Sequence, residues 1–375
     1  MSMFTGAGFN YAFLPGKCVT VPLEVPDCVC FVEGGIAEMV AIAKYPDIFC
    51  SMHLSVHFSR TPITENRHHQ NNFIGHVKRS LSAMHPDVMA RIESIGLHLS
   101  GSRFTGMGLL GGADTYVASE HARGRAIDFV IKLREATGIP VWLENANYYS
   151  VDASAAIETC ADMRQICAET NCKVILDLAH IVIEAHNCNI DPCLLLGQAP
   201  LQEVAEIHLS GITQSKDGTL HDGHGCPVAE EVWGILDAHL LLLQKYNPGV
   251  LITIEHTAPT WRRDAKTYYG DFRRLNNLLS CTRAEQCKKS PDQYMRGYLR
   301  YILRTDIPNL PKACDERGIS FDVLLDDWLQ LAQRSKKRIV VTLDDIPDCE
   351  IADSWEVRKN FLAYATGRLR AMADA

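Results

Sequence analysis

The sequence has no long apolar run, no excess of basic residues and no obvious targeting segment. No stretch of about eighteen uninterrupted apolar residues occurs, so we expect no membrane-spanning helix. The opening MSMFTGAGFNYAFLPGKC lacks the basic and apolar regions of a secretory signal, which predicts a cytoplasmic protein. The formal net charge of −8 disfavours a nucleic-acid partner, because binding to phosphates requires a basic face.

Cysteine is frequent, but its spacing is irregular. The chain has 14 cysteines, and no two of them stand in a Cys-x-x-Cys spacing. Without a secretory signal we expect reduced, mostly buried thiols and no disulfide framework. The usual nucleotide fingerprints are also missing: no G-x-G-x-x-G directly follows a predicted strand, and no P-loop motif occurs.

Short apolar or β-branched runs alternate with amphipathic segments over most of the chain. Eight runs are predicted as strands, at 5–10, 28–33, 50–56, 94–99, 139–144, 173–178, 204–209 and 250–255. The expected helices lie near 34–45, 66–83, 116–137, 152–170, 192–198, 227–246 and 261–279. Nearly continuous apolar strands separated by helices indicate a parallel sheet covered on both faces. The pattern predicts an α/β fold of the (β/α)8 barrel type, with an open doubly wound sheet as the alternative.

The pattern changes after about residue 285, where amphipathic helical segments such as SPDQYMRGYLRYILR predominate. We therefore expect two domains. Residues 1–284 would form a metal-binding catalytic barrel, and residues 285–375 would form a mainly helical extension that docks a partner or has a structural role.

The predicted strand ends carry ionisable side chains. In a (β/α)8 barrel the active site lies at the carboxyl ends of the strands. Nine candidates lie at these ends or in the loops that follow: His53, His98, Glu144, Asp177, His180, His208, Asp222, His224 and Glu255. Each one alone could be an ordinary hydrogen-bonded or helix-capping residue. Burying all of them together would cost several kcal/mol for each uncompensated charge, so we expect them to bind metal ions.

The residue types also limit the choice of metal. Imidazole and carboxylate ligands suit iron, manganese or zinc, and cysteine is missing from the predicted strand ends. Nine candidates exceed the four to six ligands of one ion, which implies two or three ions. His57 lies four residues beyond His53 on the same face of the strand, and is a candidate hydrogen-bond partner of a ligand.

The ordered set MHLS, LHLSG, WLEN, DLAH, EIHLSG, DGHG-PV and IEH, within residues 1–280, resembles the multinuclear non-heme iron-dependent oxidases, the family of MbnB and TglH. The resemblance implies a barrel of the xylose isomerase-like type with two or three irons at its mouth, as mixed Fe(II) and Fe(III), and O2 as co-substrate. It also implies modification of a cysteine in a ribosomally synthesised peptide. A leader-binding partner protein of the TglI kind is expected to form a heterodimer with the enzyme.

Two reactions of that family are open. The long extension favours TglH-like excision of the β-carbon of a C-terminal cysteine as formate, and the alternative is MbnB-like conversion of a cysteine to an oxazolone and thioamide. By this resemblance Glu144, Asp177 and His208 would act in catalysis through bound iron. Arg103, Asn145 and Asn147 follow two of the strand ends and are candidates for peptide contact.

Two other classes of function remain as alternatives. A divalent-metal sugar isomerase or phosphodiesterase would use the same kind of barrel, and bound zinc in place of iron would favour it. A non-catalytic peptide-binding module is the other alternative, and a stable metal-free protein would favour it. Buried carboxylates without cations argue against that module, because they are costly.

Overall fold

The computed structural model describes residues 3–15, 22–49, 52–101 and 116–286, together with a few residues between 314 and 368. The chain divides into two compact units, Met1–Ser280 and Cys281–Ala375. The helices and strands described below belong to the first unit, except that the last helix, Ala265–Gln286, extends a few residues into the second. Most of the predicted helical extension at 285–375 lies outside the described residues, as does Arg103.

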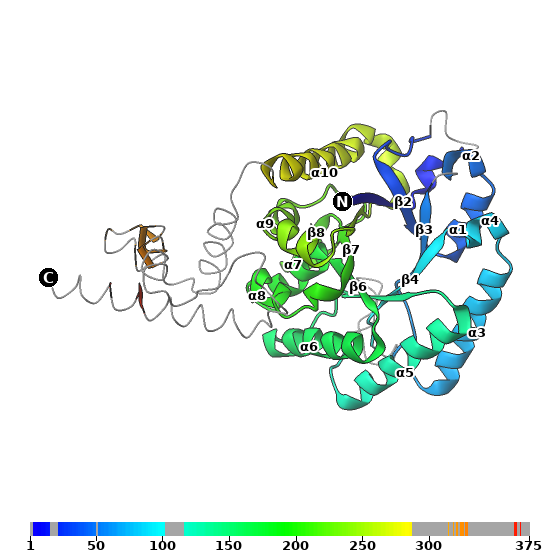
Figure 1. Cartoon of the computed structure of the whole chain (residues 1–375), viewed down its shortest axis with the longest axis horizontal. Helices are drawn as coiled ribbons and strands as arrows, with labels where there is room; N and C mark the ends of the chain where they lie inside the picture. The colour runs from blue at the N-terminus through cyan, green and yellow to red at the C-terminus, as the bar shows by residue number, and fades with distance from the viewer. Residues whose placement is uncertain are drawn as a thin grey trace. The chain divides into compact units, whose positions relative to one another are not determined.

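Eight parallel strands close into a barrel in the order β1-β10-β7-β6-β5-β4-β3-β2 (Figure 1). They are β1 (Phe4–Gly8), β2 (Val29–Gly34), β3 (His53–Phe58), β4 (Ile92–His98), β5 (Val141–Glu144), β6 (Lys173–Asp177), β7 (Val204–Leu209) and β10 (Leu251–Ile254). Each overlaps one of the eight predicted strands. The closed barrel confirms the predicted (β/α)8 fold class and excludes the open doubly wound sheet.

Helices surround the barrel (Figure 1). They are α1 (Ile36–Ala43), α2 (Pro46–Phe49), α3 (Arg67–Ser82), α4 (Pro86–Met89), α5 (Glu120–Thr137), α6 (Ala153–Thr170), α7 (Leu178–Asn187), α8 (Pro192–Leu196), α9 (Glu230–Tyr246) and α10 (Ala265–Gln286). Side chains cap several of these helices; Ser119, for example, accepts a hydrogen bond from the backbone N–H of Ala122 at the start of α5. No helix in the described part of the chain is long and apolar enough to cross a membrane.

Helix α7 and a small hairpin are additions to the predicted elements. Helix α7 follows β6 without a loop, because Asp177 ends the strand and its side chain accepts a hydrogen bond from the backbone N–H of His180. The hairpin consists of β8 (Ile212–Gln214) and β9 (Leu220–Asp222), which pair antiparallel after β7. Both additions matter for function, because His180 lies on α7 and Asp222 ends β9.

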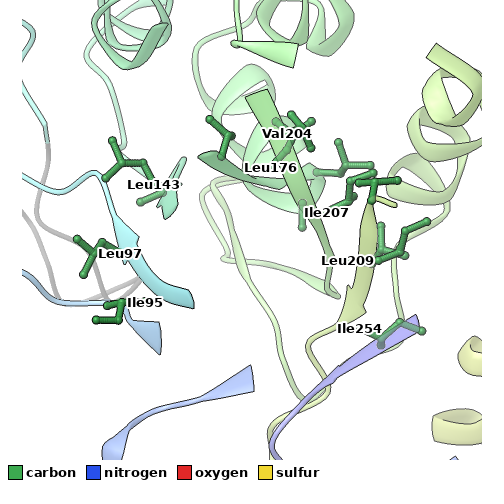
Figure 2. Close-up of a cluster of buried hydrophobic side chains, with 14 of the residues drawn as sticks. Ile95, Leu97, Leu143, Leu176, Val204, Ile207, Leu209 and Ile254 are labelled. Carbon is green, nitrogen blue, oxygen red and sulfur yellow. The ribbon is translucent and has the colours of Figure 1, made fainter. Parts of the chain in front are cut away.

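Alternating residues separate the apolar core from the polar interior of the barrel. Along β7, Ile207 and Leu209 belong to the apolar cluster in Figure 2, whereas His208 contacts carboxylates of other strands. Gly96 in β4 shows how tightly the interior is packed. A Cβ atom at that position would lie 2.4 Å from Cδ2 of His57, so the glycine makes room for the imidazole.

Candidate metal centre

Three side chains from neighbouring strands form the first group of potential ligands. His57 of β3, His98 of β4 and Glu144 of β5 each place a ligand atom within 4.8 Å of the others. His98 Nε2 lies 3.0 Å from Glu144 Oε2, and His57 Nε2 lies 2.5 Å from the same oxygen. His57 Nε2 and Glu144 Oε2 are buried without a hydrogen-bond partner, so their approach lacks hydrogen-bond alignment.

A second group shares Glu144 with the first. Glu144, Asp177, His208 and Glu255 also bring ligand atoms within 4.8 Å of one another. His208 Nδ1 lies 3.2 Å from Glu144 Oε1 and 3.4 Å from Glu255 Oε2. Glu144 therefore presents Oε2 to the first group and Oε1 to the second, which is the arrangement of a carboxylate that bridges two cations.

His180, Asp222 and His224 lie together beside these groups. His180 Nε2 is 3.6 Å from Asp222 Oδ2, and His224 Nε2 contacts the same oxygen. His180 Nδ1 is 2.7 Å from the backbone carbonyl of Asn145, to which it donates, so its Nε2 is left as the acceptor nitrogen. Nε2 of a neutral His180 is therefore available to a cation.

Two carboxylates that the sequence analysis did not select lie on the other side of His208. Glu33 ends the predicted strand 28–33, and Glu206 stands two residues before His208 on the same face of β7. Each places an oxygen 3.4 Å from His208 Nε2, and both side chains are buried. The signals that could have found them were a carboxylate near a strand end and the two-residue period of a strand.

The electrostatics of these groups are those of a site built for positive charge. Burial lowers the pKa of His57, but Glu33 and Glu144 outweigh it and raise that pKa to about 9. Burial raises the pKa of Asp177 to about 8. Burial likewise raises the pKa of Glu255, but His208 and His224 outweigh it and lower that pKa to about 2.

Unpartnered polar atoms also gather here. Eight buried side-chain atoms of the cluster have no hydrogen-bond partner among the residues that the structure describes: Glu33 Oε2, His57 Nε2, His98 Nδ1, Glu144 Oε2, Asp177 Oδ2, His180 Nε2, Glu206 Oε2 and His208 Nε2. Buried polar atoms are normally paired, and each unpaired one is costly. Metal ions would satisfy such atoms, and nitrogen and oxygen donors of this kind fit iron, manganese or zinc.

Eight of the nine predicted ligands lie in or beside these groups, and His53 is the exception. The predicted strand 50–56 was placed too early, so His53 begins β3 at the opposite end of the barrel from the centre. Its side chain is 59% exposed and pairs with Glu93 at 2.5 Å. His57, four residues further along the same face, occupies the position that was predicted for His53.

The asparagines considered for peptide contact have different surroundings. Asn145 is occupied within the fold: its Nδ2 donates to the carbonyl of Asp177 at 2.9 Å, and its Oδ1 accepts from the N–H of Asp177 at 2.9 Å. Asn147 is fully buried, and within the described part of the chain neither polar atom of its side chain has a hydrogen-bond partner. Asn145 therefore holds the end of β6, next to the ligand candidates Asp177 and His180.

Fold and site together define a (β/α)8 barrel with a cluster of potential metal ligands at the carboxyl ends of its strands. Residues 116–267 match the family described as RiPP precursor modification enzyme MbnB/TglH/ChrH. The match includes Glu144, Asp177, His180, His208, Asp222, His224 and Glu255. It supports the resemblance indicated by the strand-end motifs.

Curated relatives and solved structures are also similar to parts of the chain. A UPF0276 protein of Caulobacter vibrioides is 34% identical over 99 residues, covering 26% of this chain and 35% of the relative. A UPF0276 protein of Bordetella pertussis is 29% identical over 154 residues, covering 40% and 53%. The chain thus spans about a third to a half of the length of these relatives. A D-psicose 3-epimerase crystallised with D-fructose superposes with a TM-score of 0.39 and 15% identity, covering 67% of this chain and 84% of that one.

Proposed function

We propose that this protein is a multinuclear non-heme iron oxidase that uses O2 to modify a cysteine in a ribosomally synthesised peptide. The observation that carries the proposal is the position of Glu144, which presents one oxygen to each of two adjacent ligand groups. The third group, around Asp222, supports three ions in one centre. The family match over residues 116–267 supports a peptide as the substrate.

The donor set suits this chemistry. The ligand groups found among the described residues contain imidazoles and carboxylates and no cysteine. A substrate thiolate would therefore compete with no protein thiolate for an open coordination position. Iron in such a centre supplies O2 activation and a binding position for the thiolate.

The residues of the chain would position these components. Glu144 would help to hold two ions, because its two oxygens face different ligand groups. His180 would bind through Nε2, since its Nδ1–H is held by the carbonyl of Asn145. The Asn145 side chain would in turn fix the backbone of Asp177, so that the end of β6 and the start of α7 keep one geometry.

We propose excision of the β-carbon of a C-terminal cysteine, released as formate, as the particular reaction. Conversion of a cysteine to an oxazolone and thioamide is the alternative within the same family. A partner protein that binds the leader of the peptide would deliver the substrate as a heterodimer with this chain. We also propose Asn147 as a peptide contact, because its buried amide has no partner within the described residues.

Metal analysis followed by a peptide assay tests the proposal. The protein is purified without oxygen, and its metal content and oxidation states are measured by elemental analysis and Mössbauer spectroscopy. We expect two or three irons per chain, partly ferrous. Synthetic peptides with a terminal or an internal cysteine are then added with O2, and mass spectrometry follows loss of the β-carbon and release of formate. The Glu144→Gln variant is the control for adventitious iron.

Other outcomes point to the other classes of function. Stoichiometric zinc or magnesium without iron would contradict the oxidase and favour a sugar isomerase or a phosphodiesterase. A folded protein that binds no metal would contradict any metalloenzyme and favour a peptide-binding module. An iron protein that converts the internal cysteine to an oxazolone would replace β-carbon excision by the alternative reaction.

A further inference from the structure

His208 is the residue at which two layers of carboxylates meet. Its Nδ1 faces Glu144 and Glu255, at 3.2 and 3.4 Å, in the second ligand group. Its Nε2 faces Glu33 and Glu206, both at 3.4 Å. The ring is fully buried, so neither nitrogen is exposed to solvent.

We propose that Glu33 and Glu206 are positioning residues for the metal centre: as a pair they accept the Nε2–H of His208 and thereby present Nδ1 to the ion that His208 shares with Glu144. This inference rests on the proposed function, because it requires metal at the second ligand group. It adds a second layer of carboxylates, supplied by β2 and β7, to the ligands of the barrel mouth.

The tautomer of the ring gives the first reason. A neutral imidazole that binds a metal through one nitrogen carries its hydrogen on the other, and that N–H is usually held by a carboxylate or a backbone carbonyl. In His180 the Nδ1–H donates to the backbone carbonyl of Asn145. For His208, the oxygens that face Nε2 within the described residues belong to Glu33 and Glu206. A shift of a few tenths of an ångström would bring either into ordinary hydrogen-bond range.

Charge gives the second reason. The first and second ligand groups and the group around Asp222 together contain four carboxylates, on Glu144, Asp177, Asp222 and Glu255. Three divalent ions would exceed their charge by two, and a buried excess of charge is costly. Glu33 and Glu206 supply two further carboxylates directly beneath His208, and together the six would balance three divalent ions.

The surroundings of Glu206 favour a fixed pair. The Oγ1 of Thr253 donates a hydrogen bond to Glu206 from the neighbouring strand β10. Behind it, a Cβ atom at Gly6 would lie 2.3 Å from the same Oγ1, so the threonine is packed against the backbone of β1. Thr253 thus holds Oε1 of Glu206, the oxygen that faces His208 Nε2, and Oε2 is buried without a hydrogen-bond partner among the described residues.

The test compares metal binding by Glu33→Gln, Glu206→Gln and the double variant with that of the wild-type chain. The probe is Zn²⁺, added without oxygen, and its affinity is measured by competition with a chelator. Asp162→Asn is the matched control, because Asp162 is a buried carboxylate that binds Tyr116 and Arg123 away from the centre. Melting temperatures of the metal-free proteins identify variants that have lost their fold.

We expect the wild type to bind three ions, and each glutamine variant to bind one of them about 10- to 100-fold more weakly. The other two affinities and those of Asp162→Asn should stay unchanged. In the zinc protein, NMR of ¹⁵N-labelled histidine should show His208 as the Nε2–H tautomer, and the double variant should lose this selection. A fold defect alone would not change the tautomer.

Three results would overturn the inference. Unchanged zinc affinities and an unchanged tautomer in folded variants would reduce Glu33 and Glu206 to buried structural residues. A fourth zinc ion in the wild type, lost in both variants, would mean that the pair binds a cation of its own. A wild-type protein without any bound metal would overturn the proposed function together with this inference, whereas the first two results leave the metal centre intact.

Discussion

Glu144 stands directly opposite His98 in the parallel pairing of β5 with β4, and its Oε2 lies 3.0 Å from His98 Nε2. The carboxylate also reaches His208, whose Nδ1 is 3.2 Å from the other oxygen. The strand register therefore places one side chain between two groups of ligands. Loss of this side chain should affect more than one ion.

Replacement of Glu144 by alanine should remove metal from both groups. We expect affinity for two ions to fall at least about 100-fold, because loss of a mere hydrogen-bond partner of a ligand already costs about 10- to 100-fold. Elemental analysis after anaerobic loading measures the change. Glu255→Ala is the comparison, since Glu255 belongs to the second group alone and should affect one ion. Equal losses in the two variants would contradict a bridging role for Glu144.

His53 and His57 form a natural pair of test and control. His57→Ala should weaken the ion at the first group, because the His57 imidazole converges with His98 and Glu144. His53→Ala should leave metal content unchanged, since the His53 side chain is exposed and pairs with Glu93. Metal titration of both variants measures how much metal each one binds. Loss of metal in the His53 variant would restore the original prediction from the sequence.

The metal-free protein should become less stable as pH rises from 6.5 to 9. The pKa of His57 is raised from 6.5 to about 9, and a group with a raised pKa stabilises the fold below its unfolded pKa and loses that effect as pH rises through the folded one. The raised pKa of Asp177, about 8, acts in the same direction. For His57 alone the loss is on the order of 3 kcal/mol.

Thermal or urea unfolding at pH 6.5, 7.5 and 9 measures this dependence. The lowered pKa of Glu255 adds no slope there, since that carboxylate is ionised throughout the range in both states. With metal bound the trend should reverse, because protons no longer compete with the ion. A flat profile for the metal-free protein would show that His57 does not carry the charge expected of it.

Asn145→Ala should destabilise the protein by about 2–6 kcal/mol. It leaves the buried N–H and carbonyl of Asp177 without the two hydrogen bonds that the Asn145 amide supplies, and each unsatisfied group costs about 1–3 kcal/mol. Denaturant unfolding measures the loss. Asn147→Ala is the matched control: its equally buried amide has no partner to lose, so stability should change far less. A similar loss in both variants would mean that the two hydrogen bonds contribute little.

The barrel could be predicted because several of its strands, such as VWLE, KVILD and LITI, are short apolar or β-branched runs at regular intervals along the chain. Helix α7 was missed because β6 passes into it without a loop, so VILDLAHIVIEAHN reads as one largely apolar run. The signal between strand and helix is Asp177, which caps the helix but was selected only as a ligand. Strands β8 and β9 have three residues each, too few to show an alternating pattern.

The level of a side chain along the barrel axis was harder to predict than the face of the strand on which it lies. The two-residue period correctly put His53 and His57 on one face of β3, but it does not say which of them lies at the carboxyl end. The two histidines stand four residues apart, and the predicted strand began and ended too early, so it put His53 where His57 lies. Glu206 was missed for a related reason, since the interior of a barrel holds several layers of side chains and only the layer at the strand ends was considered. Glu33 ends its predicted strand, so the rule that selected the other candidates could have selected it too.

The closure of the barrel by β1 and β10 sets the order in which the centre can be made. Phe4 of β1 pairs with Leu251 of β10, so the barrel cannot close until β10 has been synthesised. Glu33 is made early and Glu255 more than two hundred residues later, yet both face His208. The complete set of potential ligands therefore exists only after the chain has been translated as far as Glu255, so the centre cannot assemble on a shorter nascent chain.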